Sequence, residues 1–147
     1  MALIFSWNPT ICEIDKKKFE KAKIELRNLR SKQKCLKEKS IKTLHFDKEL
    51  EPLWNTIKEA TSSNKSSSGV SVTKFLHFSF SNIFPMIDSK RMKVLYGETV
   101  VNLQTYKMFL KEWKTIYEKN EAKFENLSKK MNMPVARILD IMIFTPK

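Results

Sequence analysis

The sequence predicts an all-α protein that folds as one domain of six or seven helices. The 147 residues include only two glycines and five prolines, too few for the many turns of a sandwich or barrel. Apolar residues recur at intervals of three and four through most of the chain, which is the helical period. The length allows one core but is short for two ordinary domains. We therefore expect a single helical domain over residues 1–147.

The N-terminal part is predicted to contain an apolar lead-in and one long basic helix. Residues 1–14 form the lead-in, as a short strand or an irregular segment. From Asp15, which is suited to cap a helix, to Lys39, apolar positions follow helical spacing and cations fill the other faces. Twelve Lys or Arg lie between Lys16 and Lys42. Such a face is either solvated or directed at phosphate groups, and the sequence leaves both readings open.

A second helix is predicted from Lys48 to Ala60, and a loop follows it. The inward positions of this helix are all large and apolar: Leu50, Leu53, Trp54 and Ile57. Residues 61–69 are almost all Ser, Thr, Asn or Gly, which predicts a flexible loop. It is not a domain boundary, because the chain on either side is too small for its own core.

The centre of the chain is predicted to hold a buried helix and a short capped one. Residues 70–80 carry large apolar side chains on more than one side, which favours a central helix. Pro85 prevents this helix from continuing. Asp88 or Ser89 is then placed to cap a helix from Lys90 to Tyr96, which Gly97 ends.

Three helices are predicted in the remaining part. Asn102 is expected to cap a helix from Leu103 to Lys119, and two more follow at about 121–131 and 134–144, the last with Pro134 in its first turn. The helix after Asn102 has a strong inward stripe, composed of Tyr106, Phe109, Leu110, Trp113, Ile116 and Tyr117.

The charge balance points to an anionic partner. The chain has 28 Lys and Arg against 16 Asp and Glu, a formal net charge of +12. Such an excess attracts polyanions, although it also serves solubility. We expect nucleic acid, and DNA in particular, as the partner. The alternative is a structural module whose helix stripes dock on a partner protein.

Other classes of protein fit the sequence less well. No apolar run approaches the roughly 20 residues of a membrane helix, and the N-terminus lacks the basic region and cleavage site of a signal peptide. The spacing of Cys12 and Cys35, with His45 and His77, does not match a zinc site. We expect a cytoplasmic protein with two buried thiols, no metal and no cofactor.

Two ionisable residues flank the central apolar run, Lys74 at its start and Asp88 at its end. An ammonium group that enters an apolar environment loses hydration, which favours the neutral, nucleophilic amine. A carboxylate at a helix N-terminus is held ionised by backbone N–H groups. Lys74 and Asp88 are therefore candidate catalytic residues, whereas the plainer alternatives are a snorkelling lysine and a simple helix cap.

Further candidates lie close to these two or in the C-terminal tail. His77, three residues after Lys74, is either a proton acceptor beside the amine or a structural histidine of the core. Ser89, Lys90 and Arg91 open the helix after Asp88. In the tail, Arg137 and Asp140 are three residues apart and can pair across one helical turn.

The run G69-V-S-V-T-K74 resembles the hairpin of the helix-hairpin-helix DNA glycosylase superfamily, especially its oxoguanine branch. Ser71 or Val72 stands where that hairpin has its second glycine. The stretch from Lys74 to Ser89 is also similar to small, poorly characterised helical proteins with a K-x-L-H-F and F-P-x-x-D-S core and a terminal R-x-L-D, here Arg137 to Asp140. The resemblance covers this central stretch and the tail.

The resemblance implies a helix-hairpin-helix-like centre and a role in DNA repair. In those glycosylases the hairpin N–H groups hold a DNA phosphate, the lysine attacks the sugar C1′ and the aspartate assists. The corresponding residues here are Lys74 and Asp88. Gly69 corresponds to the phosphate-binding hairpin. To it we add further candidates for nucleic-acid contact: Ser71, Thr73, Ser89, Lys90, Arg91 and Arg137.

The C-terminus supports a second reading. Residues 127–142 resemble a helix-turn-helix, with an Asn-Met-Pro turn and a second helix that carries Arg137. This second helix is mostly apolar, which favours a place in the core. We therefore expect a nucleic-acid-binding protein with a glycosylase-like core, and keep a catalytically silent regulator as the alternative. Whether the protein is an enzyme is left open.

Overall fold

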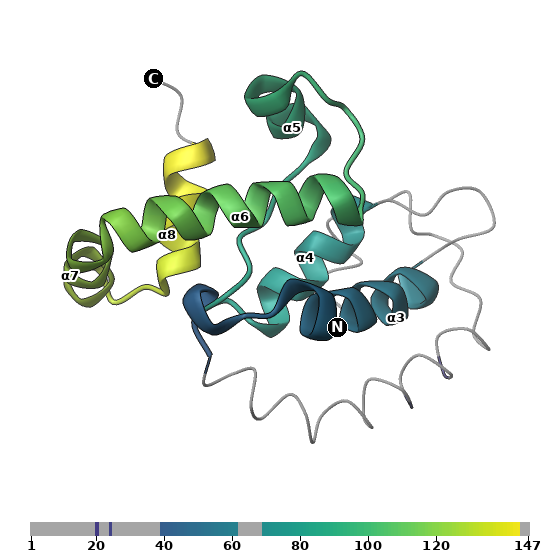
Figure 1. Ribbon diagram of the computed structural model, residues 1–147, viewed down its shortest axis with the longest axis horizontal. Coiled ribbons are helices and arrows are strands. Elements are labelled where there is room, and N and C mark those ends of the chain that lie inside the picture. Colours follow the sequence, from purple (N-terminus) through teal and green to yellow (C-terminus); the bar gives the residue numbers. More distant parts are fainter. Residues whose placement is uncertain (1–19, 21–23, 25–38, 62–68, 145–147) are drawn as a thin grey trace.

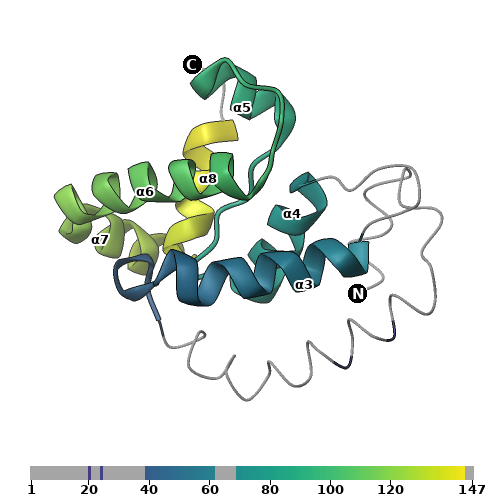
Figure 2. The same ribbon diagram turned by 45° about the vertical axis from the view of Figure 1, so that its right-hand side comes forward.

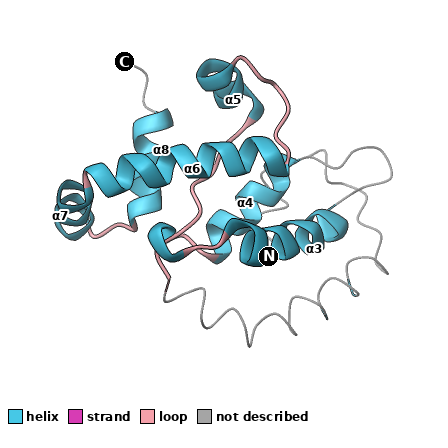
Figure 3. Ribbon diagram, viewed as in Figure 1, coloured by secondary structure: helices cyan, strands magenta, loops and turns pink. Residues whose placement is uncertain are grey.

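The computed structural model describes residues 20, 24, 39–61 and 69–144. Within these residues the chain forms six α-helices, two short helical turns and no strand, which confirms the all-α prediction (Figure 3). The predicted lead-in and almost all of the predicted helix from Asp15 to Lys39 lie outside the described residues. The α-helices are α3 (Glu51–Thr61), α4 (Gly69–Ser79), α5 (Ser89–Tyr96), α6 (Leu103–Lys119), α7 (Glu121–Met131) and α8 (Val135–Phe144).

Helix α6 runs through the middle of the molecule (Figure 1). On one side lie α3 and α4, which pack on each other, and α7 packs on α8 near the C-terminal end of α6. Helix α5 lies on the other side of α6 from α3 in both views (Figure 2). The short turns η2 (Ile41–Thr43) and η3 (Phe46–Leu50) lead into α3.

The core joins α6 to the helices on either side of it. The rings of Trp54 on α3 and Tyr106 on α6 have centroids 5.4 Å apart, and those of Trp113 on α6 and Phe124 on α7 are 4.9 Å apart. The predicted stripe of α6 is buried except for Ile116, which is 46% exposed because it lies at the edge of the stripe. The four inward residues predicted before and within α3 are all buried: Leu50, Leu53, Trp54 and Ile57.

Helix ends follow the capping residues in the sequence. The Asn102 side chain accepts from the Thr105 N–H at 2.9 Å, and Thr105 Oγ1 accepts from the Asn102 N–H at 2.9 Å, so α6 begins at a reciprocal cap. Gly97 ends α5 with φ of 73°. Asn132 ends α7 with φ of 50°, a conformation that asparagine tolerates. The predicted C-terminal end of α5 and both predicted ends of α6 are confirmed, whereas α5 begins one residue earlier than predicted.

Helix α4 is buried around much of its first turns, but two of the three apolar residues on which the prediction of a central helix rested are not buried. Phe78 is 58% exposed, and Phe75 is partly buried. The buried face includes the polar residues Ser71, Thr73 and His77. The prediction failed because it counted only apolar side chains, whereas α4 turns a partly polar face inward.

The start of α4 also differs from the prediction. Residues 69–74, which the resemblance predicted to form a hairpin, are the first turns of this helix. Both ends of the predicted loop at 61–69 are helical, since α3 includes Thr61 and α4 begins at Gly69. A Cβ on Gly69 would lie 1.8 Å from the carbonyl oxygen of Val101 and 3.3 Å from Trp54 Cζ2. Glycine is required here by the close approach of two backbones.

Candidate functional site

An extended segment, Phe84–Asp88, connects the turn after α4 to α5, and we call it the braced segment. Tyr106 of α6 donates its hydroxyl hydrogen to the carbonyl oxygen of Pro85 at 2.8 Å. Thr73 of α4 donates to the carbonyl oxygen of Ile87 at 2.9 Å. Both bonds are buried. They satisfy carbonyl groups that an extended chain leaves without helical or sheet partners.

Two further bonds hold the beginning of the braced segment. Nδ1 of His77, on α4, lies 2.8 Å from the carbonyl oxygen of Phe84. The Met86 N–H donates to Oδ1 of Asp140, on α8, at 2.8 Å. Side chains from α4, α6 and α8 therefore all converge on one short stretch of backbone. This arrangement fixes the direction in which the chain enters α5.

His77 and Asp140 also face each other. His77 Nε2 lies 3.3 Å from Asp140 Oδ2, and the two side chains are 6% and 1% exposed. Nδ1 faces a carbonyl oxygen, which only accepts, so Nδ1 carries a hydrogen. Nε2 then faces a carboxyl oxygen, and two lone pairs would repel. A single proton between Nε2 and Oδ2 would remove this repulsion.

The surroundings of Asp140 determine its protonation. Burial raises the pKa of its carboxyl group above the ordinary 3.8, although His77, the Met86 N–H and Arg137 act in the opposite direction. Arg137 Nη1 is 3.6 Å from Oδ2, which confirms the predicted pairing across one turn of α8. The Arg137 side chain is 49% exposed, so this ion pair is partly screened by solvent. Burial and the charge of Asp140 also raise the pKa of Tyr106.

The structure confirms the simpler role of Asp88. Its Oδ1 accepts from the Arg91 N–H at 2.8 Å, so Asp88 is the N-cap of α5. Lys74 is partly exposed, and among the described residues no ion pair joins it to Asp88. The two residues nevertheless directly follow Thr73 and Ile87, which are hydrogen-bonded to each other.

The direction of the chain carries Asp88 toward the N-terminal half of α4, and Lys74 is the middle residue of that helix. His77 meets Phe84 and Thr73 meets Ile87, so the braced segment runs antiparallel to α4. Side chains on a helix lean toward its N-terminus, which is the end where the braced segment reaches Asp88. We call the group of Lys74, Ser89 and Lys90 the α4–α5 edge. Ser89 and Lys90 are exposed, and Arg91 is partly buried beside them.

The residues predicted to hold a phosphate divide into two groups. Ser89 and Lys90 are exposed at the start of α5, and Arg137 is exposed on α8. Gly69, Ser71 and Thr73 are buried, with Ser71 and Thr73 only 2% and 0% exposed. This corrects the prediction for those three residues, because they belong to the inner face of α4 and are not open to a ligand.

Sequence reasoning missed the bonds that Thr73 and Tyr106 make to the braced segment. Tyr106 was predicted only as part of an apolar stripe. One signal was available: a proline inside an apolar run forces an extended, buried backbone, whose carbonyl groups need donors from elsewhere. The sequence does not say which hydroxyl groups supply them.

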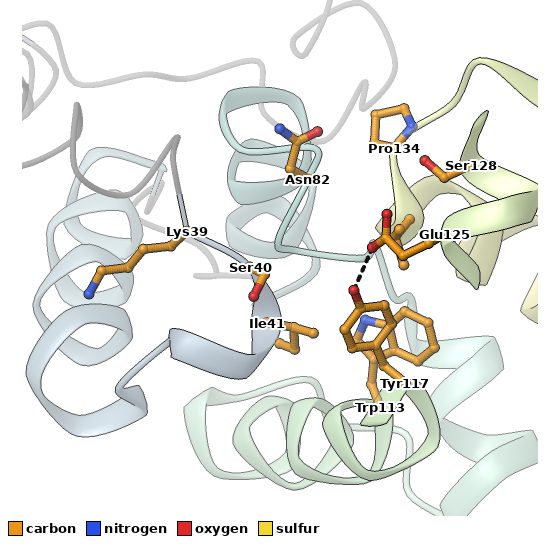
Figure 4. A pocket seen from close by; sticks show the side chains of 10 residues that line it. Lys39, Ser40, Ile41, Asn82, Trp113, Tyr117, Glu125, Ser128 and Pro134 are labelled. Atoms are coloured by element: carbon orange, nitrogen blue, oxygen red, sulfur yellow. Dashed lines mark hydrogen bonds between the residues drawn. The ribbon is translucent and has the colours of Figure 1, made fainter. Parts of the chain in front are cut away.

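A separate hollow of about 210 Å³ lies between η2 and the ends of α6, α7 and α8 (Figure 4). Trp113 and Tyr117 form one wall, and Tyr117 donates to Glu125 at 2.5 Å. Burial, and then this bond, raise the pKa of Tyr117. Both aromatic side chains are almost fully buried. The candidates Lys74, Asp88 and His77 do not line this hollow.

Within residues 39–61 and 69–144, no group of three or more His, Cys, Asp or Glu side chains is arranged to hold a metal ion. Cys12 and Cys35 lie outside the described residues. No helix in the described part of the chain is long and apolar enough to cross a membrane. Comparison of the chain with protein-family models, with curated proteins and with solved structures finds no match.

Proposed function

We propose that this protein binds nucleic acid and that the α4–α5 edge contacts the phosphate backbone. The observation that supports the proposal is the Thr73–Ile87 hydrogen bond, because Lys74 directly follows one of its partners and the start of α5 lies two residues after the other. Lys90 extends from that start, and α5 has no acidic residue in its first turn. The net charge of +12 supports a polyanionic partner.

Charge is distributed unevenly along the chain. The described ranges 39–61 and 69–144 hold 16 Lys and Arg and 11 Asp and Glu, a net +5, which leaves +7 of the total +12 for the other residues. Several described cations are already paired, among them Lys39, Lys42 and Lys107. In this proposal the α4–α5 edge contacts phosphate groups directly, whereas the remaining cations add to the general electrostatic attraction.

The salt dependence of binding to a short duplex of random sequence tests this proposal. Neutralising phosphates makes affinity fall steeply between about 50 and 200 mM salt. The double variant Lys74→Gln and Lys90→Gln should bind more weakly and show a shallower slope, by about 0.9 for each phosphate that is no longer neutralised. Lys58→Gln, at an exposed position of α3, is the matched control and should reduce binding less. Affinity that does not change with salt, or an equal effect of the control, would contradict the proposal.

A lysine-dependent DNA glycosylase is the second candidate function. The observation in its favour is that Lys74 and the helix-capping Asp88 each directly follow a partner of the Thr73–Ile87 hydrogen bond. In such a reaction the Lys74 amine attacks the sugar C1′, the base leaves and an imine forms. Borohydride reduces the imine to a stable adduct with damaged duplex DNA. An adduct that disappears in Lys74→Ala supports this activity; no adduct with wild-type protein on any damaged duplex rejects it.

The helix-turn-helix alternative has less support. On α8 the residues Ala136, Ile138, Leu139 and Asp140 are buried, so this helix presents little surface to a groove. A protein-docking role remains as an outcome of the binding test. If the binding test finds no affinity for nucleic acid, that result favours protein docking. The surface for it would include the apolar residues Val94 and Leu95 of α5, which are 70% and 47% exposed.

A further inference from the structure

The braced segment leads the chain from the turn after α4 into α5, so its backbone determines where the α4–α5 edge lies. Side chains hold it at four backbone groups, and two of these bonds, to Phe84 and Met86, come from His77 and Asp140. These two side chains are themselves joined through Nε2 and Oδ2 at 3.3 Å. A change in the protonation of one side chain therefore affects both the bond to Phe84 and the bond to Met86.

We propose that the proton shared by His77 and Asp140 is a switch, and that its loss releases the beginning of the braced segment and weakens nucleic-acid binding at the α4–α5 edge. Only the last step rests on the proposed function. The release of the segment can be tested without any ligand.

The geometry gives the reason for the switch. With the proton present, Nδ1–H donates to the Phe84 carbonyl and the second ring nitrogen is matched to the carboxyl group. Without it, a buried carboxylate oxygen faces a ring lone pair, and the nearest cationic group among the described residues, Arg137 Nη1, is 3.6 Å away, beyond ordinary hydrogen-bond distance. A buried charge without a donor is strongly unfavourable. The protein relieves this by letting water reach the pair, which requires the braced segment to move.

The other groups around His77 and Asp140 do not supply the donor that the pair lacks after it loses its proton. From α6, Tyr106 approaches with its hydroxyl committed to the Pro85 carbonyl. From α8, Arg137 lies 3.6 Å from Oδ2 and is half exposed, so its charge is partly screened. The braced segment itself contributes backbone groups, of which the Met86 N–H is bound to the other oxygen, Oδ1. The pair therefore depends on its own proton.

The variant Asp140→Asn removes the carboxyl group that shares the proton but keeps the shape of the side chain. An asparagine has the same shape, and its oxygen can accept from the Met86 N–H. Its amide nitrogen can then donate to a neutral His77 Nε2 while Nδ1–H still donates to Phe84. This variant should be folded and braced, and it needs no shared proton. Arg137→Gln is the control for simple loss of a nearby charge.

The first measurement is amide hydrogen exchange at Met86 between about pH 5 and pH 9, a range that spans ordinary histidine titration. If opening requires the loss of one proton, the protection factor should fall about tenfold per pH unit once the pair titrates. It should stay constant in Asp140→Asn and keep the wild-type fall in Arg137→Gln. A protection factor that is independent of pH in the wild type, or the same fall in Asp140→Asn, would overturn the switch.

The second measurement is affinity for a short random duplex over the same pH range at fixed salt. Wild-type affinity should fall severalfold as the Met86 amide loses protection, and Asp140→Asn should not show this step. If protection falls but affinity for the duplex does not, the link between the switch and the α4–α5 edge is wrong. If no duplex binding occurs at any pH, the proposed function fails, whereas the exchange result still decides whether the switch exists.

Discussion

The hydroxyl group of Tyr106 donates a 2.8 Å hydrogen bond to the carbonyl oxygen of Pro85, and so connects α6 to the braced segment. Tyr106 is fully buried. Pro85 has no N–H of its own, and its buried carbonyl has no helical partner. A residue predicted only as part of an apolar stripe is thus also a specific support for the entry into α5.

Tyr106→Phe should destabilise the protein by about 1–3 kcal/mol, because it keeps the ring but leaves a buried carbonyl without a donor. Chemical denaturation measures the change in the free energy of unfolding. Tyr96→Phe is the matched control, since the Tyr96 hydroxyl donates to Glu112 at an exposed position. An equal loss in the two variants would mean that the bond to Pro85 has no special weight.

Gly69→Ala should be far more damaging than Gly97→Ala. At Gly69 a methyl group would lie 1.8 Å from the Val101 carbonyl oxygen, and this clash can be avoided only if α4 shifts. We expect a loss of at least about 3 kcal/mol, at the upper end of overpacking effects. At Gly97 there is open space, and only the φ of 73° opposes a side chain, at about 1–2 kcal/mol. Thermal unfolding of the two variants gives the order, and the reverse order would contradict the observed packing.

Asn102→Ala should lower stability by about 1 kcal/mol, because it removes the cap of α6 and leaves the Thr105 N–H without its partner. Gln104→Ala, in the first turn of the same helix and exposed, serves as the control and should change stability little. Chemical denaturation compares the two. Equal free energies of unfolding for the two variants would show that the cap contributes nothing.

Stability should depend on pH through Asp140. Its pKa is raised in the folded protein above the ordinary 3.8, so the folded state holds this proton more tightly than the unfolded state does. The stabilisation that the carboxyl group gives is therefore complete below about pH 3.8 and is lost as pH rises through the raised pKa. The free energy of unfolding of wild type minus that of Asp140→Asn should fall over this window. A difference that rises with pH would show that the pKa is lowered instead.

Much of the fold could be predicted because the relevant signals are local. Asn102, Gly97 and Pro134 mark helix ends within one turn, and the spacing of Trp113 and Tyr117 gives the inward face of α6 directly. The prediction for α4 was less accurate, since Phe78 points outward and a partly polar face points inward. Apolar spacing alone cannot show that a buried helix face serves to bind backbone carbonyl groups.

The candidate site could not be predicted in the same way, because it is formed by contacts between distant parts of the chain. The Met86–Asp140 bond joins residues 54 positions apart, and no local pattern predicts such a contact. The sequence singled out His77, Asp88, Arg137 and Asp140, but it could not show that two of them brace a connecting segment. Residues 69–74 begin α4, and the group that requires glycine at position 69 is the backbone of the distant Val101.

Mapping of amide chemical shifts during titration with a short duplex tests the proposed binding edge most directly. We predict that the largest shifts occur at Lys74 and across residues 88–91, and that they weaken together as salt is raised. Shifts confined to α7 and α8, or no shifts at any duplex concentration, would contradict the assignment of nucleic-acid binding to this edge.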